Sequence, residues 1–164
     1  MQTRIADRRI TWLVAGAVLG MAIAYYCPTE PALADTAASG DKFSMATCNT
    51  LAGNSDAVFV LDMVTGRLLG AAYNTQTGGF TQTYARSLAA DFGVTTRGEY
   101  VMVSGLGNLR STGGGPPATG VIYVGEMTSG MVNMYGFLYQ QSPALQPTKE
   151  LVLLASFPWR QSIN

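Results

Sequence analysis

The side chains that could carry chemistry are few in this sequence, and their spacing completes no catalytic motif. The chain contains no histidine, which removes Ser-His-Asp and Cys-His catalysis, histidine-ligated zinc and ordinary haem ligation. Ser39 and Lys42 have the spacing found in serine acyl enzymes, but their partner motifs are absent. The stretch GLGNLR, from Gly105, begins like a dinucleotide fingerprint, but Arg110 replaces the third glycine. We therefore predict that the protein is not an enzyme and that it needs no cofactor.

Carboxylates are the remaining candidates for acid–base chemistry or a calcium site. Asp62 and Glu126 each open a stretch that ends in glycine, DMVTG and EMTSG. Neither stretch has the order of acidic residues that a calcium loop requires. An acidic residue followed by a hydroxyl residue and a glycine is typical of a tight hairpin turn. The sequence therefore predicts that both carboxylates shape turns and that no residue binds a metal ion.

Charge is scarce along the whole chain. Charged residues make up 12% of the sequence and hydrophobic residues 48%, and ten basic residues balance ten acidic ones. A chain without a positive field does not attract a phosphate backbone, so nucleic acid is not an expected partner. The length of 164 residues is enough for one domain with a hydrophobic core.

The N-terminus has the pattern of an export signal. Arg4, Arg8 and Arg9 precede an uncharged, mostly apolar run over residues 10–26. A basic flank followed by an apolar stretch is typical of a secretory signal. We therefore expect export, with the N-terminus in the cytoplasm and the rest of the chain outside.

The fate of residues 1–27 is open, because they fit either a signal peptide or a signal anchor. The small residues before Asp35 suit cleavage after Ala34, which would leave a periplasmic or secreted protein. The length of the run 10–26 approaches that of a membrane span, which would anchor the chain in the cytoplasmic membrane through one transmembrane helix. Residues 28–42 are rich in small residues and proline, and we predict a flexible tether there.

The domain proper is predicted to cover residues 43–164 and to be all-β. Short segments with β-branched or aromatic residues alternate with clusters of glycine, asparagine, threonine and proline. The stretch 86–92 fits either a helical turn or the end of a strand. The predicted strands are FSMATC, AVFVLDM, RLLGAAYN, GFTQTYAR, EYVMVSGL, GVIYVGEM, MVNMYGFLYQ and ELVLLASF.

One long stretch of the sequence nearly repeats. VFVLDMVTGRLLGAAY, residues 58–73, returns as IYVGEMTSGMVNMYGF, residues 122–137, and the preceding FSMAT and YVMVS also align. We predict two pseudo-repeats over 43–92 and 99–159, each a four-stranded antiparallel unit. Strands joined by a T-G or S-G turn are typical of β-propeller blades, so we expect propeller-like units, with a β-sandwich or small barrel as the alternative. A propeller needs at least four blades, which would require a homo-oligomer.

The order of these segments resembles that of a set of uncharacterised exported or membrane-anchored bacterial proteins with propeller-like strand repeats. The likeness rests on EPALADTAASGDKFSMAT, on VFVLDMVTGRLLGAAYNTQTG and on PATGVIYVGEMTSGMVNMYGF. It implies an exported domain and no particular activity. Small sugar-binding lectins that assemble from two-blade chains are similar in architecture only.

Two groups of residues are candidates for contact with a partner. The loop in which the second repeat departs from the first contains Gly113, Gly114, Gly115, Pro116 and Pro117. Trp159 and Arg160 lie together near the C-terminus, where they could cover a sheet edge or contact a partner.

The function expected from these features is interaction or assembly in the cell envelope. The partner would be the protein itself, as a homo-oligomer, or another envelope protein. The alternative is a carbohydrate-binding, lectin-like module, which the tyrosine-rich strands and the low charge favour.

Overall fold

The computed structural model describes residues 12–22, 37–51, 55–95, 97–107, 109 and 115–160. The chain divides into two units, Met1–Leu33 and Ala34–Asn164. In the first unit, residues 12–22 form a helix. None of the helices within the described ranges is long and apolar enough to cross a membrane. The predicted cleavage site at Ala34 and Asp35 lies outside the described residues.

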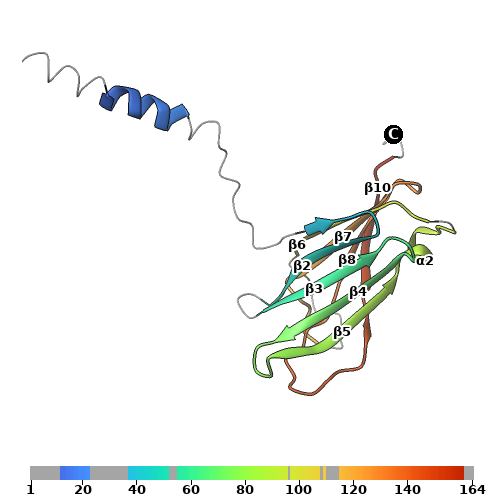
Figure 1. The fold of residues 1–164 in the computed structure, drawn as a ribbon. Coiled ribbons are helices and arrows are strands. Elements are labelled where there is room, and N and C mark those ends of the chain that lie inside the picture. Colours follow the sequence, from blue (N-terminus) through green and yellow to red (C-terminus); the bar gives the residue numbers. More distant parts are fainter. Residues whose placement is uncertain are drawn as a thin grey trace, which may run out of the picture. The chain divides into compact units, whose positions relative to one another are not determined.

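The second unit contains two β-sheets, which are visible as two layers in Figure 1. Sheet A has six strands in the order β1-β2-β3-β4-β5-β9. Neighbouring strands in this sheet are antiparallel, except that β9 pairs parallel with β5. Its strands are β1 (Ala37–Ser39), β2 (Phe43–Leu51), β3 (Ser55–Asp62), β4 (Arg67–Asn74), β5 (Gly79–Ser87) and β9 (Lys149–Glu150).

Sheet B has four antiparallel strands in the order β6-β7-β8-β10. The long connection from β8 to β10 first adds β9 to sheet A and then crosses to sheet B at the buried Leu151. The strands of sheet B are β6 (Tyr100–Leu106), β7 (Gly120–Glu126), β8 (Met131–Gly136) and β10 (Val152–Pro158).

The two predicted hairpins are present and use the same turn chemistry. In the β3–β4 turn the Gly66 N–H donates to the Asp62 carbonyl at 2.9 Å, and in the β7–β8 turn the Gly130 N–H donates to the Glu126 carbonyl at 3.1 Å. The two glycines have φ values of 63° and 65°, which only glycine adopts without strain. The prediction that these carboxylates and glycines shape turns is confirmed.

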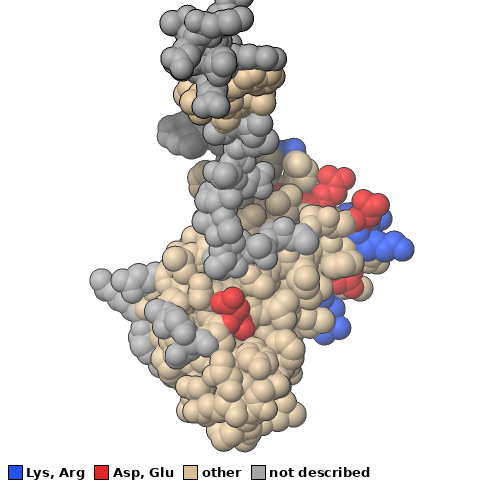
Figure 2. Space-filling view, turned by 60° about the vertical axis from the view of Figure 1, so that its left-hand side comes forward, with Lys and Arg blue, Asp and Glu red and all other residues tan. Residues whose placement is uncertain are grey.

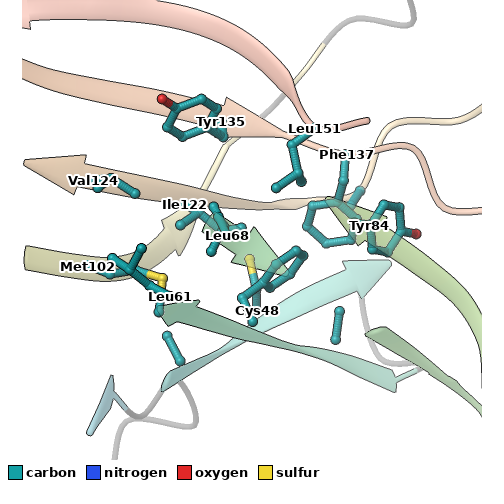
Figure 3. Packing of buried hydrophobic residues seen from close by; sticks show 14 of the residues in the cluster. Cys48, Leu61, Leu68, Tyr84, Met102, Ile122, Val124, Tyr135, Phe137 and Leu151 are labelled. Atoms are coloured by element: carbon teal, nitrogen blue, oxygen red, sulfur yellow. The ribbon is translucent and has the colours of Figure 1, made fainter. Parts of the chain in front are cut away.

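The hydrophobic core lies between the sheets, and Figure 3 shows its side chains converging from both layers. Phe59 and Tyr84 of sheet A contact Phe137, which follows β8, with ring centroids 5.0 and 5.1 Å apart. Cys48 is in this core. Gly120 lets β7 approach β2 closely, because a Cβ there would lie 2.4 Å from the Cys48 Sγ.

The sheets approach each other unevenly. On one side β2 lies against β6 and β7. On the other side the segment 137–151 fills the space beside β5, where Tyr84 donates to the Leu138 carbonyl at 2.9 Å and the Gln146 N–H donates to the Thr81 carbonyl at 2.8 Å. Every residue of β10 from Val152 to Phe157 is exposed. The two sheets therefore converge at β2 and β6 and diverge toward β5 and β10.

The two repeats bury opposite faces. The β2–β3 register pairs Phe43 with Asp62, and the β6–β7 register pairs Tyr100 with Glu126, so the aligned residues occupy equivalent places. Yet Met45 is 41% exposed, whereas its counterpart Met102 is 3% exposed. The same inversion holds at other aligned positions. The residue of the first repeat is buried and its counterpart in the second repeat is not in the pairs Ala46/Val103, Phe59/Tyr123 and Leu68/Val132. The residue of the second repeat is the buried one in the pairs Leu69/Asn133 and Tyr73/Phe137.

One sequence expectation is met in part, and two need correction. Each sheet contains the expected four-stranded antiparallel unit, but no propeller and no closed barrel is seen among the described residues. Within the predicted tether 28–42, residues 37–39 pair with β2 as an edge strand, because their backbone groups complete its ladder. The predicted final strand is split between the two sheets at Leu151, which is buried between them.

The helical turn near residue 88 is real, and it follows directly on a strand. Strand β5 ends at Ser87, and α2 (Leu88–Phe92) begins at the next residue. Leu88 is buried in the core, and Gly93 ends the helix with a φ of 65°. The two interpretations of this stretch, helical turn and strand end, therefore both hold for adjacent residues.

Candidate functional site

The outer face of sheet B carries a shallow apolar groove of about 260 Å³. Its floor is formed by β6, β7 and β8, and its end lies at the β7–β8 turn. Val101 is 65% exposed although it lies within a strand. The lining residues are Glu99, Val101, Val103, Tyr123, Gly125, Glu126, Met127, Val132 and Trp159.

The hollow exists because small residues alternate with large ones on this face. Gly125 stands where the first repeat has Leu61, so the outer face near the end of β7 carries no side chain at this position. Beside it, the Tyr123 ring leans over Gly105, where an added Cβ would lie 3.0 Å from the Tyr123 Cε2 atom. An exposed apolar hollow of this kind is a feature of protein or ligand binding surfaces.

Trp159 and Arg160 are held at the end of this groove. The backbone N–H groups of Trp159 and Arg160 donate to the Gly130 carbonyl at 3.0 and 3.4 Å. The Arg160 guanidinium lies 4.8 Å from the centre of the Trp159 ring, within range of a cation–π contact. A Cβ at Gly130 would come within 2.6 Å of the Arg160 Cβ, so the turn glycine also leaves room for this pair. The backbone of Trp159 is thereby held at the end of the groove, and its ring lines the rim.

Strand β10 forms one edge of sheet B, next to the groove. Its sequence, VLLASFP, contains no charged residue, and Leu153, Leu154 and Phe157 are all exposed. Natural edge strands are usually short, charged, bulged or covered, because an open apolar edge pairs with other chains. β10 has a bulge between Leu153 and Ala155 and ends at Pro158, but it carries no charge to repel a partner.

The glycine and proline loop lies at a different place from this groove. Gly113 and Gly114 are outside the described residues. Pro117 forms an antiparallel bridge with Leu138, and the Tyr139 N–H donates to the Pro116 carbonyl at 3.1 Å. Gly115, the other described member of the predicted loop, has a φ of 135°. A second, smaller groove of about 210 Å³ is lined by Leu109, Pro117, Gly136, Phe137, Leu138, Val152 and Leu154.

The carboxylates of the two turns are occupied by hydrogen bonds. Asp62 accepts from the Thr65 hydroxyl at 2.6 Å and from the Val64 N–H at 2.8 Å, and these bonds hold the pKa of its carboxyl below the ordinary value. Burial alone would raise the pKa of Glu126, but hydrogen bonds from the Ser129 and Thr128 N–H groups outweigh burial and keep this pKa low. Both carboxylates therefore stabilise their turns in the ionised form.

One charged cluster was not foreseen from the sequence. Arg86 at the end of β5 pairs with Asp91 of α2 at 2.6 Å and with Glu150 of β9 at 2.6 Å. The Tyr135 hydroxyl of β8 donates to Asp91 at 2.9 Å, which links the two sheets. The hydrogen bond to Asp91 raises the pKa of Arg86. The short spacing of Arg86 and Asp91 around a helical turn could have indicated their ion pair. Glu150 is distant in sequence, and no local pattern indicates its contact with Arg86.

Charged side chains are unevenly placed on the domain. On the face drawn in Figure 2, most of them gather along one side, and a broad surface of uncharged residues beside them contains an isolated acidic residue. Within the described parts of the chain, no group of three or more histidine, cysteine, aspartate or glutamate side chains could hold a metal ion. The arrangement offers an apolar groove, an exposed tryptophan at its rim and an uncharged edge strand. Comparison of the chain with protein-family models, with curated proteins and with solved structures finds no match.

Proposed function

We propose that this chain is an exported, non-enzymatic β domain of the bacterial cell envelope whose work is protein interaction or assembly. The partner is another envelope protein or a further copy of the chain. The observation that carries the proposal is the mostly apolar groove on the outer face of sheet B, with the uncharged, exposed strand β10 at an edge of the same sheet. Burying such a surface against a partner removes apolar area from water, which stabilises the complex.

Export is supported by the N-terminal sequence alone. Arg4, Arg8 and Arg9 precede the uncharged run 10–26, and the chain beyond it has the low charge common in exported proteins. The domain would therefore stand outside the cytoplasmic membrane. It would be held there through residues 10–26, or released into the periplasm or medium after cleavage at Ala34.

The binding surface suits a protein better than a charged or strongly polar ligand. Apart from Glu99 and Glu126 at the turn end, the groove is lined by apolar side chains and glycine, and the Glu126 carboxylate is already bonded within its turn. Protein interfaces have an apolar core with a polar rim and are enriched in tryptophan and tyrosine. Tyr123 in the groove and Trp159 at its rim fit that pattern.

A photo-cross-linking experiment in the producing cells tests this function. The full chain would carry benzoylphenylalanine in place of Val103, within the groove, or in place of the exposed Thr77 in the β4–β5 turn as a matched control. We expect a light-dependent adduct with a defined protein from the Val103 position and none from the Thr77 position. Adding Tyr123→Glu should abolish the adduct, because an unpaired charge opposes burial. Equal adducts from both positions, or none from either, would refute the function.

The two sheets are also proposed to be blade-like units. In a propeller the sheets of neighbouring blades lie face to back and converge toward a central axis. The two repeats bury opposite faces, and their sheets converge at β2 and β6, which fits that relation. Association of two, three or four copies would then supply four, six or eight blades.

A carbohydrate-binding function is the second candidate, favoured by the exposed Trp159 beside Tyr123 in one groove. Aromatic rings of this kind could stack on sugar rings, and Glu99 could accept a hydrogen bond from a hydroxyl. A glycan array on the full chain tests it. If a glycan binds and the binding is lost in Trp159→Ala, carbohydrate binding is the function in place of protein interaction. If no glycan binds at millimolar concentration, the carbohydrate-binding function is rejected.

A further inference from the structure

The outer face of each sheet consists of the repeat positions that the other sheet buries. Because the repeats bury opposite faces, the outer face of sheet A presents the positions that sheet B buries, and the outer face of sheet B presents the positions that sheet A buries. Leu69, on the outside of β4, is the counterpart of the buried Asn133, and Val103, on the outside of β6, is the counterpart of the buried Ala46.

Both outer faces are apolar where a partner would sit. On sheet A, Leu69 is 45% exposed in the middle of β4, and Met45, Tyr73 and Phe80 are exposed around it. Tyr73 and Phe80 form an edge-to-face ring pair, with centroids 6.0 Å apart. On sheet B, Val103 is 48% exposed on the floor of the groove. On sheet A, the charged Asp62 and Arg67 lie at strand ends, away from the centre of that face.

We infer that the occupant of the sheet B groove is the outer face of sheet A of a second copy. This inference rests on the proposed interaction function and names its partner. The contact would repeat between chains the packing that already joins sheets A and B within one chain, with β6 of one copy against β2 and β3 of the next.

The contact is heterologous, because it joins two different surfaces, so each copy can engage two neighbours. Within the chain the sheets converge at β2 and β6 and diverge at β5 and β10. The β domain of one chain is therefore wedge-shaped, with its narrow edge at β2 and β6. Copies that stack face to face with their narrow edges on the same side turn around a common axis. The expected product is therefore a closed ring of a few copies, in which β2 and β6 lie near the axis and the exposed β10 lies at the outside.

The test uses two variants of the full chain, each of which disables one face. Leu69→Glu places a charge on sheet A, and Val103→Glu places one on sheet B. Thr77→Glu, in the exposed β4–β5 turn, is the matched control. Sedimentation velocity in a mild detergent measures assembly, and thermal unfolding followed by circular dichroism shows that each variant is folded. If either variant does not fold, Tyr73→Glu and Val101→Glu replace them on the same faces.

We expect wild type and Thr77→Glu to form the same oligomer, and each face variant to be monomeric, with an apparent dissociation constant raised about tenfold or more. A mixture of the two face variants should form a heterodimer and nothing larger, because one intact face of each kind remains. Cross-links from benzoylphenylalanine at Val103 should map to β2 and β3 of the other copy.

Other results would overturn the contact. If Leu69→Glu still dimerises while Val103→Glu does not, sheet B pairs with itself. If the mixture stays monomeric, the two faces do not bind each other. A monomeric wild type that still gives the Val103 adduct with another protein overturns the self-contact and leaves the interaction function in place. A monomeric wild type without any such adduct overturns both.

Discussion

The β3–β4 hairpin and the β7–β8 hairpin have the same turn and opposite orientations. In both, an acidic side chain accepts hydrogen bonds from the turn and a glycine with positive φ closes it. In the first hairpin Phe59 and Leu68 face the core, whereas their counterparts Tyr123 and Val132 face outward. The difference teaches that turn chemistry fixes a hairpin's local shape, while the neighbouring sheet decides which face is buried.

The first way to break this comparison is to truncate the aromatic pair Phe137 and Tyr73. Phe137 is buried against Phe59 and Tyr84, so Phe137→Ala should lower the free energy of unfolding by about 3–5 kcal/mol. Tyr73→Ala removes an exposed ring and should cost about 1 kcal/mol or less. Urea unfolding at concentrations where the protein is monomeric measures both. Equal costs would mean that the two faces are not inverted.

The methionine pair sharpens the comparison, because the same residue type occupies both positions. Met102→Ala leaves a cavity in the core and should cost about 2–5 kcal/mol. Met45→Ala alters an exposed side chain and should change the free energy of unfolding by about 0.5 kcal/mol or less. The same urea titration decides, and a larger loss in Met45→Ala than in Met102→Ala contradicts the burial pattern.

The turn glycines should respond alike, since the turns are the shared feature. Gly66→Ala and Gly130→Ala each force a side chain into the left-handed region, which costs about 1–2 kcal/mol. The added Cβ would also meet the Tyr100 Oη at 2.9 Å or the Arg160 Cβ at 2.6 Å. Gly79→Ala is the control, because a Cβ there meets nothing within 4 Å. Thermal unfolding that spares one turn glycine but not the other would show that the turns differ.

The smallest effect concerns the two turn carboxylates and their response to pH. Burial raises the pKa of Glu126, but the turn hydrogen bonds bring it below the ordinary 4.5, so its stabilisation is complete above that value and is lost as the pH falls through the folded pKa. Glu126→Gln should cost about 1 kcal/mol at neutral pH. It should also flatten the loss of stability between about pH 5 and pH 2.

Asp62→Asn is the matched variant of the exposed turn. The Thr65 hydroxyl and the Val64 N–H lower the pKa of Asp62 below 3.8, so the sign of its effect is the same. The effect should be smaller than that of Glu126→Gln, because solvent screens an exposed carboxylate. Urea titrations at a series of pH values compare the two. A stability gain on acidification in either wild-type turn would contradict the assigned hydrogen bonds.

Much of the strand pattern could be predicted because it depends on neighbours in sequence. Alternating apolar residues and the stretches DMVTG and EMTSG place strands and turns without knowledge of the rest of the chain. The candidate site was found only in part. Trp159 and Arg160 were singled out, but the groove beside them needs Val101, Tyr123 and Gly125 to come together from two strands.

The missed features all join residues far apart in the chain. The Arg86–Glu150 ion pair depends on β9 joining sheet A, and no local pattern in TKELVLL indicates that β9 does so. The split of the last predicted strand has the same origin, because Leu151 is drawn into the core between the two sheets. Contacts of this kind are decided by how elements pack, which periodicity does not encode.

The sequence by itself determined the two pseudo-repeats, their hairpin turns, the scarcity of charge and the absence of histidine. Each of these depends on residue type or on spacing within a few residues. Only the tertiary structure decided that the first repeat buries one face and the second buries the other. Strands with apolar residues on both faces leave that choice to the neighbouring sheet, since either face could enter a core. Of the faces left outside, the one around Val103 carries the groove of the proposed function, and the one around Leu69 is the surface inferred to occupy that groove in a second copy.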